Sequence, residues 1–328
     1  MRPPLIIQIL SLAFVMALGL TARADDGFSL PADPAQWINS GPISMESLKG
    51  KSAFLWFYEE GCPNCRRKWP DLVQLSQQYQ GQPIVFIAVN SGNPRQAVEQ
   101  YIRGVDVPWP VIVDPLREFE KACGVNEISL ENIHQVMVID PNGRLASGDW
   151  SDLPATVDSA LNGAKWNLDP KEIAQPLLPA WQSIEFGDYA SAATALKKAL
   201  KSSKPDVKAS ATKLSDYVNA DMQKRLEPAA GVDDAWLKYK TYKEVNERFA
   251  GYELPEEVTS GLKRLAVDPA VKGQIAAYRQ FIQIKNSLQS NNPTIRNGAL
   301  ARLKTFAEAN AETDAGKEAE ALRQQIRN

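Results

Sequence analysis

The stretch Phe54-Leu-Trp-Phe-Tyr-Glu-Glu-Gly-Cys-Pro-Asn-Cys65 joins an apolar run to two cysteines within twelve residues. A short apolar run that ends at a turn is typical of a buried strand, and the residues after Cys62 favour a helix. At the first turn of that helix the unpaired N–H groups and the positive dipole end favour a thiolate at Cys62. Cys65 follows one turn later, where it can close a disulfide with Cys62, and three cations follow at 66–68. The stretch therefore predicts a redox-active cysteine pair at a strand-to-helix junction.

Two other roles are open to such a pair, namely metal ligation and an inert structural disulfide. Structural zinc sites take four ligands, and the only other cysteine and histidine in the sequence are Cys123 and His134. We therefore expect redox chemistry at Cys62 and Cys65, with no metal and no cofactor. For Cys123 we expect a buried thiol that packs as a small apolar side chain, with a resolving role in the chemistry as the alternative.

The first 24 residues have the pattern of a signal peptide. One basic residue precedes an apolar run from Leu5 to Leu20, and Ala22-Arg23-Ala24 is a small-x-small cleavage site. An uncleaved anchor is the alternative, but the run is shorter than the roughly 20 residues that span a membrane. No later segment is apolar enough to cross one. The sequence therefore predicts a periplasmic or otherwise exported protein that is soluble after cleavage.

Composition excludes several other classes. The 328 residues allow two or three domains, and 44% apolar with 23% charged residues are ordinary for globular proteins. With 37 basic and 39 acidic residues the chain lacks the basic excess of a nucleic-acid-binding protein. Three cysteines are too few for a disulfide-stabilised scaffold.

Strand-like and helix-like segments alternate over residues 37–165, after a Pro- and Asp-containing lead-in segment at 25–36. This alternation ends in a hairpin and predicts a three-layer α/β sandwich. We expect strands at 52–58, 84–89 and 107–114, a hairpin over 135–147, and helices at 62–79, 94–103, 115–122 and 153–161.

Several motifs of this segment together resemble a known superfamily. Gly61-Cys-Pro-Asn-Cys65, with Pro70 five residues further on, is similar to the active-site segment of thioredoxins. The later runs Val107-Pro-Trp-Pro-Val-Ile-Val-Asp114, Cys123-Gly-Val125 and Val138-Ile-Asp-Pro-Asn-Gly143 resemble the peroxiredoxin/TlpA (AhpC/TSA) branch of that superfamily. The resemblance implies a thioredoxin-like fold over 37–165, protein thiol or disulfide substrates, and a partner that recycles the cysteine pair.

The resemblance also implies supporting roles around the cysteines. Pro70 would kink the first long helix, and Pro63 and Asn64 would help to set the redox potential of the pair. The chain departs from the pattern at Trp56, where thioredoxins have a buried acid, and at Glu59, where peroxiredoxins have a threonine. The second departure argues against peroxidase activity, which we keep as an alternative.

His134 stands where thiol oxidoreductases of this branch have a cis-proline and where peroxiredoxins have an arginine. A cis bond before a residue other than proline costs roughly 3–4 kcal/mol, so we expect a trans bond here. One interpretation is that the histidine fills the vacated proline site. The other is that its imidazole contacts the cysteines, stabilising a thiolate or joining them as a copper or zinc ligand, as in Sco-like copper-binding proteins.

Residues 166–328 contain no cysteine and no histidine, and their apolar residues recur with helical period. Asp169-Pro170 fits a helix start after the boundary at 162–169. We expect buried stripes that include Tyr242, Val218, Ile282 and Ile295, and an all-α domain of about seven helices. The segment 187–200 resembles one half of a tetratricopeptide repeat, with no steady repeat period behind it.

Taken together, these features predict an exported thiol–disulfide oxidoreductase with an α/β thioredoxin-like domain and an all-α domain. Cys62 would attack a substrate disulfide and Cys65 would resolve the mixed disulfide. The contrasting hypothesis is a non-enzymatic binding or scaffold protein with a degenerate thioredoxin fold. In either case the helical domain could present the first domain to protein partners.

Overall fold

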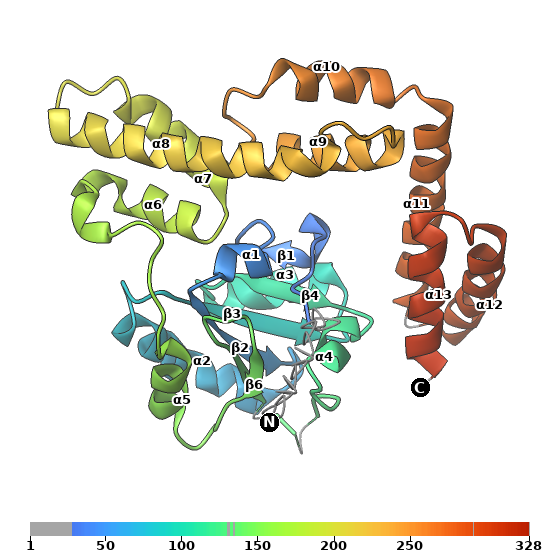
Figure 1. Ribbon diagram of the computed structural model, residues 1–328. Helices are drawn as coiled ribbons and strands as arrows, with labels where there is room; N and C mark the ends of the chain where they lie inside the picture. Colours follow the sequence, from blue (N-terminus) through green and yellow to red (C-terminus); the bar gives the residue numbers. More distant parts are fainter. Residues whose placement is uncertain (1–27, 130–131, 134, 291, 328) are drawn as a thin grey trace, which may run out of the picture.

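The computed structural model describes residues 28–129, 132–133, 135–290 and 292–327, and Figure 1 shows their arrangement. The predicted signal peptide lies outside the described residues. Within them, an α/β sandwich is followed by a large all-helical region, which is the fold class that the sequence predicts.

The sandwich is built on one six-stranded sheet with the order β1-β4-β3-β2-β5-β6. Strand β2 pairs in parallel with β3, and β3 with β4, whereas β1, β5 and β6 each join antiparallel. The strands are β1 Trp37–Ile38, β2 Ser52–Tyr58, β3 Ile84–Ser91, β4 Val111–Asp114, β5 Val136–Ile139 and β6 Leu145–Ser147. The helices of the sandwich are α1 Met45–Leu48, α2 Pro63–Gln78, α3 Arg95–Val105, α4 Glu118–Ala122 and α5 Leu153–Leu161, with a short 3-10 helix at Pro34–Gln36.

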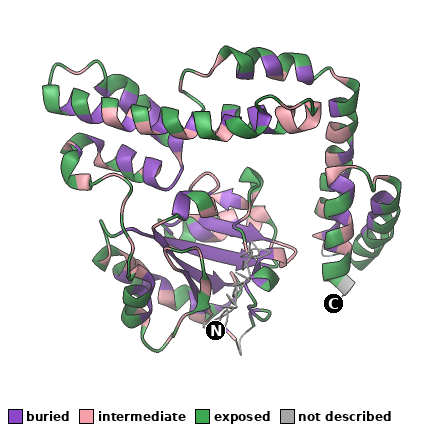
Figure 2. Ribbon diagram, viewed as in Figure 1, coloured by how far each residue is buried: buried purple, intermediate pink, exposed green. Residues whose placement is uncertain are grey.

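Strand β2 is central because both of its faces are covered. All seven of its residues are buried, as the strands in Figure 2 show, which explains why it reads as a continuous apolar run rather than an alternating one. On one face Trp56 packs edge-on against Trp69 of α2, with ring centroids 4.5 Å apart. On the other face Phe57 stacks on Phe119 of α4, at 6.3 Å. Helices therefore cover both faces, and the prediction of a three-layer sandwich is confirmed.

The helical region contains eight α-helices among the described residues, close to the seven expected. They are α6 Leu178–Glu185, α7 Tyr189–Ala199, α8 Pro205–Leu226, α9 Ala235–Arg248, α10 Glu256–Leu265, α11 Pro269–Leu288, α12 Pro293–Ala309 and α13 Asp314–Arg327. Short 3-10 helices lie at Pro170–Glu172, Gln175–Leu177 and Glu227–Ala229. One apolar core joins α6 to α10 with the start of α11, and a second joins the rest of α11 to α12 and α13. We call α11–α13 the C-terminal arm.

Ion pairs join the helical region to the sandwich at several places. At the start of β2, Lys51 forms an ion pair of 3.2 Å with Glu185 of α6, and both side chains are 0% exposed. Beside α4, Lys285 of α11 pairs with Glu118 at 3.1 Å. Figure 1 shows the corresponding arrangement, with α6–α9 over one side of the sheet and the C-terminal arm beside α4.

Three sequence expectations need correction. Ile282 and Ile295, which we expected on buried stripes, are each 48% exposed. In α11 the neighbouring residues Phe281 and Ile284 are buried instead. The helix expected over 115–122 begins at Glu118, because Arg117 adopts a left-handed conformation with φ 58° that no α-helix contains. The edge strand β1 was not expected at all, since two residues carry no periodic pattern.

Candidate active site

The cysteine pair lies at the junction that the sequence predicts, where β2 passes through a turn into α2. Cys62 is the N-cap of α2, in extended conformation with φ −89° and ψ 109°, and Pro63 is the first helical residue. The backbone N–H of Cys65 donates a hydrogen bond to the Sγ of Cys62 at 3.2 Å. An N-cap acceptor normally satisfies one of the unpaired N–H groups of a helix, and here a sulfur atom does so. Helix α2 therefore holds Cys62 by a contact to its sulfur atom.

Both thiols of the pair are free and buried, with 3% of Cys62 and 1% of Cys65 exposed. Burial, followed by a hydrogen bond with Cys62, raises the pKa of Cys65 to about 12. A hydrogen bond from the backbone of Glu59 acts in the opposite direction, while the charge of the Glu59 carboxylate raises the pKa further. Near neutral pH Cys65 is therefore a thiol. This is the state expected of the second cysteine before it attacks a mixed disulfide.

An aromatic cluster packs behind the pair. The indole Nε1 of Trp69 donates to the hydroxyl of Tyr101 on α3 at 3.1 Å, and Tyr58 stacks on Tyr101 at 5.4 Å. Pro70 lies within α2 and cannot donate to the carbonyl of Arg66, so the ladder of the helix is interrupted directly after Trp69. These residues close the inner side of the site.

Asn64 and the cations beyond it lie on the outer side. The carboxamide oxygen of Asn64 accepts from the guanidinium of Arg67. Lys68 is paired with Asp71 at 3.5 Å, and both side chains are largely exposed. One of the three cations at 66–68 is thus paired with an acidic group within α2 itself.

The acidic residues before the pair have different environments. The Oε1 of Glu59 forms a 2.6 Å ion pair with the Nη2 of Arg117. The Oε2 of Glu60 is buried and has no hydrogen-bond partner among the described residues; burial, followed by the charge of Glu59, raises the pKa of Glu60. Arg117 was not expected from the sequence, because the two partners are 58 positions apart and no local motif marks the pair.

Cys123 is the C-cap of α4 and is buried. Burial, followed by the charges of Asp114 and Glu120, raises the pKa of Cys123. This thiol thus sits among acidic groups that disfavour a thiolate. His134 lies outside the described residues, so both of its interpretations stay predictions. Among the described residues, no group of three or more His, Cys, Asp or Glu side chains is placed to hold a metal ion.

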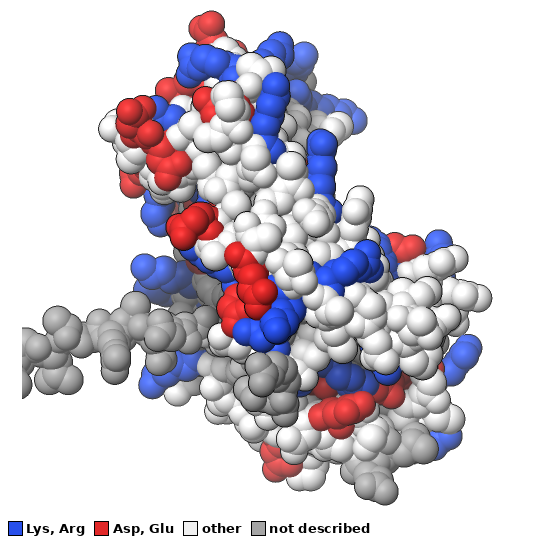
Figure 3. All heavy atoms as spheres, turned by 90° about the vertical axis from the view of Figure 1, so that its right-hand side faces the viewer, with Lys and Arg blue, Asp and Glu red and all other residues white. Residues whose placement is uncertain are grey.

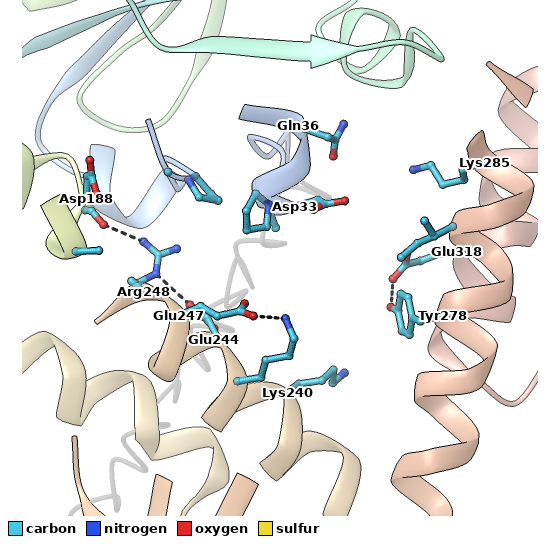
Figure 4. Close-up of a pocket in the computed structure, with 18 of the residues that line it drawn as sticks. Asp33, Gln36, Asp188, Lys240, Glu244, Glu247, Arg248, Tyr278, Lys285 and Glu318 are labelled. Atoms are coloured by element: carbon cyan, nitrogen blue, oxygen red, sulfur yellow. Dashed lines mark hydrogen bonds and ion pairs between the residues drawn. The ribbon is translucent and has the colours of Figure 1, made fainter. Parts of the chain in front are cut away.

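A hollow lies elsewhere, between the two parts of the chain. It is a cleft of about 980 Å³ that the lead-in segment borders on one side and α9 and α11 on the other. The charged groups on its α9 side pair along that helix: Arg248 with Glu244 at 3.4 Å (Figure 4), and Lys243 with Glu247 at 2.6 Å. Figure 3, seen from the side of the C-terminal arm, shows both signs of charge interspersed rather than a continuous basic face. In the part of the chain that the structure describes, no helix is both long and apolar enough to cross a membrane.

Comparison with known proteins shows what the first part of the chain is similar to. Residues 24–147 match the model of the AhpC/TSA family. The thiol-disulfide oxidoreductase ResA of Bacillus subtilis is 25% identical over 143 residues, which are 41% of this chain and 77% of the relative. The ResA of Halalkalibacterium halodurans is 32% identical over 86 residues, which are 26% of this chain and about half (49%) of the relative.

A solved structure matches the same part of the chain. The thiol:disulfide interchange protein of Chlorobium tepidum TLS is 26% identical with a TM-score of 0.31, and the match covers 40% of this chain and 97% of that protein. The family match, the ResA relatives and the ordered motifs agree. The first part of this chain has a thioredoxin-like fold, is similar to the AhpC/TSA family and to ResA, and is fused to an all-helical region.

Proposed function

We propose that this protein is an exported thiol–disulfide oxidoreductase whose redox centre is Cys62-Pro63-Asn64-Cys65. The observation that supports it most is the hydrogen bond from the Cys65 N–H to the Cys62 Sγ, because a helix terminus that donates to sulfur stabilises a thiolate. The relatives named thiol-disulfide oxidoreductase support the same class of enzyme.

The proposed reaction has two exchange steps. The Cys62 thiolate attacks one sulfur of a substrate disulfide, forming a mixed disulfide and releasing the other sulfur as a thiolate that takes up a proton. Cys65 then loses its proton and attacks the Sγ of Cys62. The Cys62–Cys65 disulfide forms, and the substrate leaves with its second sulfur reduced. A dithiol partner that reverses this oxidation completes the cycle; the opposite direction uses the same steps in reverse.

Export and partners belong to the same proposal. The predicted signal peptide at 1–24 would carry the protein to the periplasm or another exported compartment, where protein disulfides form. Its substrates would be protein thiols or disulfides, and the helical region would present the redox domain to them. Cross-linking of the trapped mixed disulfide, followed by peptide mapping, would show whether the partner contacts α6–α13.

The test is dithiothreitol-coupled reduction of insulin by the purified full chain. Cys62→Ser should abolish the reaction, and Cys65→Ser should accumulate a mixed disulfide that a reductant releases. Cys123→Ala is the matched control, because it also removes a buried thiol, and it should keep the rate within about tenfold, or 1.4 kcal/mol. Equal activity of wild type and Cys62→Ser would rule out the proposal.

The cysteine variants, together with two His134 variants, distinguish the alternative functions. A binding or scaffold protein would show no difference between wild type and either cysteine variant. A copper or zinc protein would take up one metal ion in the reduced state, and His134→Ala would weaken that uptake strongly. A thiolate absorbance that titrates identically in wild type, His134→Ala and His134→Pro would leave His134 a space-filling residue.

A further inference from the structure

Glu59 is an acidic neighbour of Cys65, the proposed resolving cysteine. Its backbone donates a hydrogen bond that favours the Cys65 thiolate, whereas its carboxylate opposes that thiolate by charge. Its backbone carbonyl also accepts from the N–H of Cys62 at 3.3 Å. One residue therefore contacts both cysteines, and its two effects on Cys65 have opposite signs. The net effect depends on what neutralises the carboxylate.

Arg117 neutralises it. Its Nη2 lies 2.6 Å from the Oε1 of Glu59, and its Nη1 lies 2.8 Å from the Oε1 of Glu120. All three side chains are largely shielded from solvent: 20% of Arg117, 28% of Glu59 and 1% of Glu120 are exposed. Glu127, the third acidic neighbour, is more distant, at 3.5 Å, and largely exposed. The guanidinium thus bridges the cysteine loop to α4 in a partly desolvated place, where an ion pair is screened less than on the surface.

The backbone around Arg117 is shaped to hold this position. Arg117 adopts φ 58°, in the left-handed region that residues other than glycine seldom occupy. A Cβ on Gly92, at the end of β3, would lie 2.7 Å from the Nη2 of Arg117, so only glycine leaves room for the guanidinium. A left-handed conformation at a residue other than glycine costs free energy, and such residues cluster at functional sites. The conformation of Arg117 therefore suggests that its ion pair with Glu59 has a functional role.

The C-terminal arm braces the same segment from outside. Leu116 packs against the core of α11–α13, Glu118 pairs with Lys285, and the Nζ of Lys121 donates to the backbone carbonyl of Gln325 at 3.1 Å. The residues that flank Arg117 on both sides are therefore held by helices nearly 200 positions further along the chain.

We propose that Arg117 is a positioning residue for the redox pair: held by the C-terminal arm, it compensates the Glu59 carboxylate beside Cys65 and thereby speeds the resolution of the mixed disulfide. The inference rests on the proposed thiol–disulfide exchange and adds the element that controls its second step. In that step Cys65 gives its proton to solvent, forms a bond to the Sγ of Cys62, and the electron pair of the broken disulfide leaves with the substrate sulfur. Without Arg117, the uncompensated charge of Glu59 opposes the thiolate that this attack needs.

The groups that face Cys65 come from four places. They are Tyr58 on β2, Tyr101 on α3, Cys62 on its own helix and Glu59 in the loop. Glu59 is the carboxyl group among these described residues, and both tyrosines have a pKa raised by burial, so they stay neutral near pH 7. Glu59 is therefore the charge whose compensation matters.

The experiment compares four full-length variants: Arg117→Gln, Arg117→Lys, Glu59→Gln and the double variant Glu59→Gln/Arg117→Gln. Rapid quenching with acid and alkylation measures the lifetime of the mixed disulfide with a single-disulfide substrate. Arg117→Gln should lengthen it about tenfold, which corresponds to 1.4 kcal/mol. Arg117→Lys should restore part of the loss, and the double variant should resolve within about twofold of Glu59→Gln. Arg144→Gln, which breaks an exposed ion pair with Asp140, is the control and should not change the lifetime.

A second readout does not need exchange activity. In the Cys62→Ser background, the alkylation rate of Cys65 at pH 9 reports its thiolate fraction, and Arg117→Gln should lower that rate about tenfold, with recovery when Glu59→Gln is added. An inactive wild type would refute the proposed function, while this titration would still decide the role of Arg117. A double variant as slow as Arg117→Gln alone, in both readouts, would overturn the inference, because only loss of structure then explains the defect. If Arg117→Gln does not fold, Arg117→Lys against Glu59→Gln/Arg117→Lys gives the same comparison.

Discussion

At the scale of single residues, a group can be tuned by the place it occupies rather than by its motif. Asp114 ends β4, is 0% exposed, and accepts a 2.8 Å hydrogen bond from the N–H of Glu120 through one oxygen. Its other oxygen has no hydrogen-bond partner among the described residues. Burial raises the pKa of Asp114 from 3.8 to about 6, more than the backbone hydrogen bonds lower it. Asp114, the last residue of the motif at 107–114, therefore binds its proton more tightly than an exposed aspartate does.

This makes stability depend on pH with a definite sign. The folded protein binds the Asp114 proton more tightly than the unfolded chain, so the contribution is present below about pH 4 and is lost as the pH rises through about 6. Relative to Asp114→Asn, which cannot titrate, wild type should lose roughly 2–3 kcal/mol of unfolding free energy between pH 4 and pH 7. Urea unfolding of both proteins at a series of pH values measures the difference. A difference that stays constant with pH would contradict the prediction.

At the scale of elements, the helical region depends on close packing that the apolar stripes alone do not specify. In α10, a Cβ on Gly261 would lie 2.6 Å from the Cε2 of Tyr242 on α9. Tyr242 is buried, so its ring has little room to move. Glycine is here a requirement of helix contact rather than of backbone conformation.

Gly261→Ala should therefore destabilise the protein by about 1–3 kcal/mol, the usual cost of overpacking a core. Gly273→Ala on α11 is the matched control, because nothing lies within 4 Å of the position that a Cβ would take there. There the better helix propensity of alanine should stabilise the protein by up to about 1 kcal/mol. Thermal unfolding of the two variants should thus shift in opposite directions; equal shifts would show that the α9–α10 contact is looser than it looks.

At the scale of the whole molecule, one buried ion pair joins the two parts of the chain. The Oε2 of Glu185 accepts from the Nζ of Lys51 and from both nitrogens of Asn167, and its Oε1 accepts from the N–H of Leu168 at 2.7 Å. Burial lowers the pKa of Lys51, against the charge of Glu185, which raises it. Each charge is tolerated in the interior because the other is present.

Removing one partner should be expensive. Lys51→Met should cost about 3–5 kcal/mol because it leaves Glu185 buried without a counter-charge. Lys51→Met/Glu185→Leu should cost less than Lys51→Met alone, and Lys224→Met, which breaks the exposed pair with Glu46 across the same interface, should change little. Guanidinium unfolding followed by tryptophan fluorescence compares them. Equal effects of the Lys51 and Lys224 variants would show that water reaches the buried pair.

Much of the sandwich could be predicted from the sequence because its signals are local. The strand at 52–58 and the helix at 153–161 have the bounds that their patterns indicate. The expected burial of Ile282 and Ile295 was wrong because alanine, phenylalanine and isoleucine occur on several sides of these helices, and only the packing of α11–α13 selects one side. At the candidate site, the Cys-Pro-Asn-Cys turn follows from spacing, whereas Arg117 and Glu185 depend on contacts that join distant positions. Such contacts leave no periodic trace in one sequence.

Phe186, from the helical region, contributes to the core of the sandwich. This contribution matters for any attempt to express or transplant the thioredoxin-like domain alone. A gene cut at residue 165 would keep every strand and both cysteines of the pair, yet it would expose an apolar hole and leave Lys51 without its counter-charge. Cutting after residue 188 would keep Phe186 and Glu185, but it would leave α4 without the contacts that the C-terminal arm makes. The thioredoxin-like domain therefore cannot be transferred to another protein by cutting at residue 165. A functional transfer has to include the helical region, α6–α13.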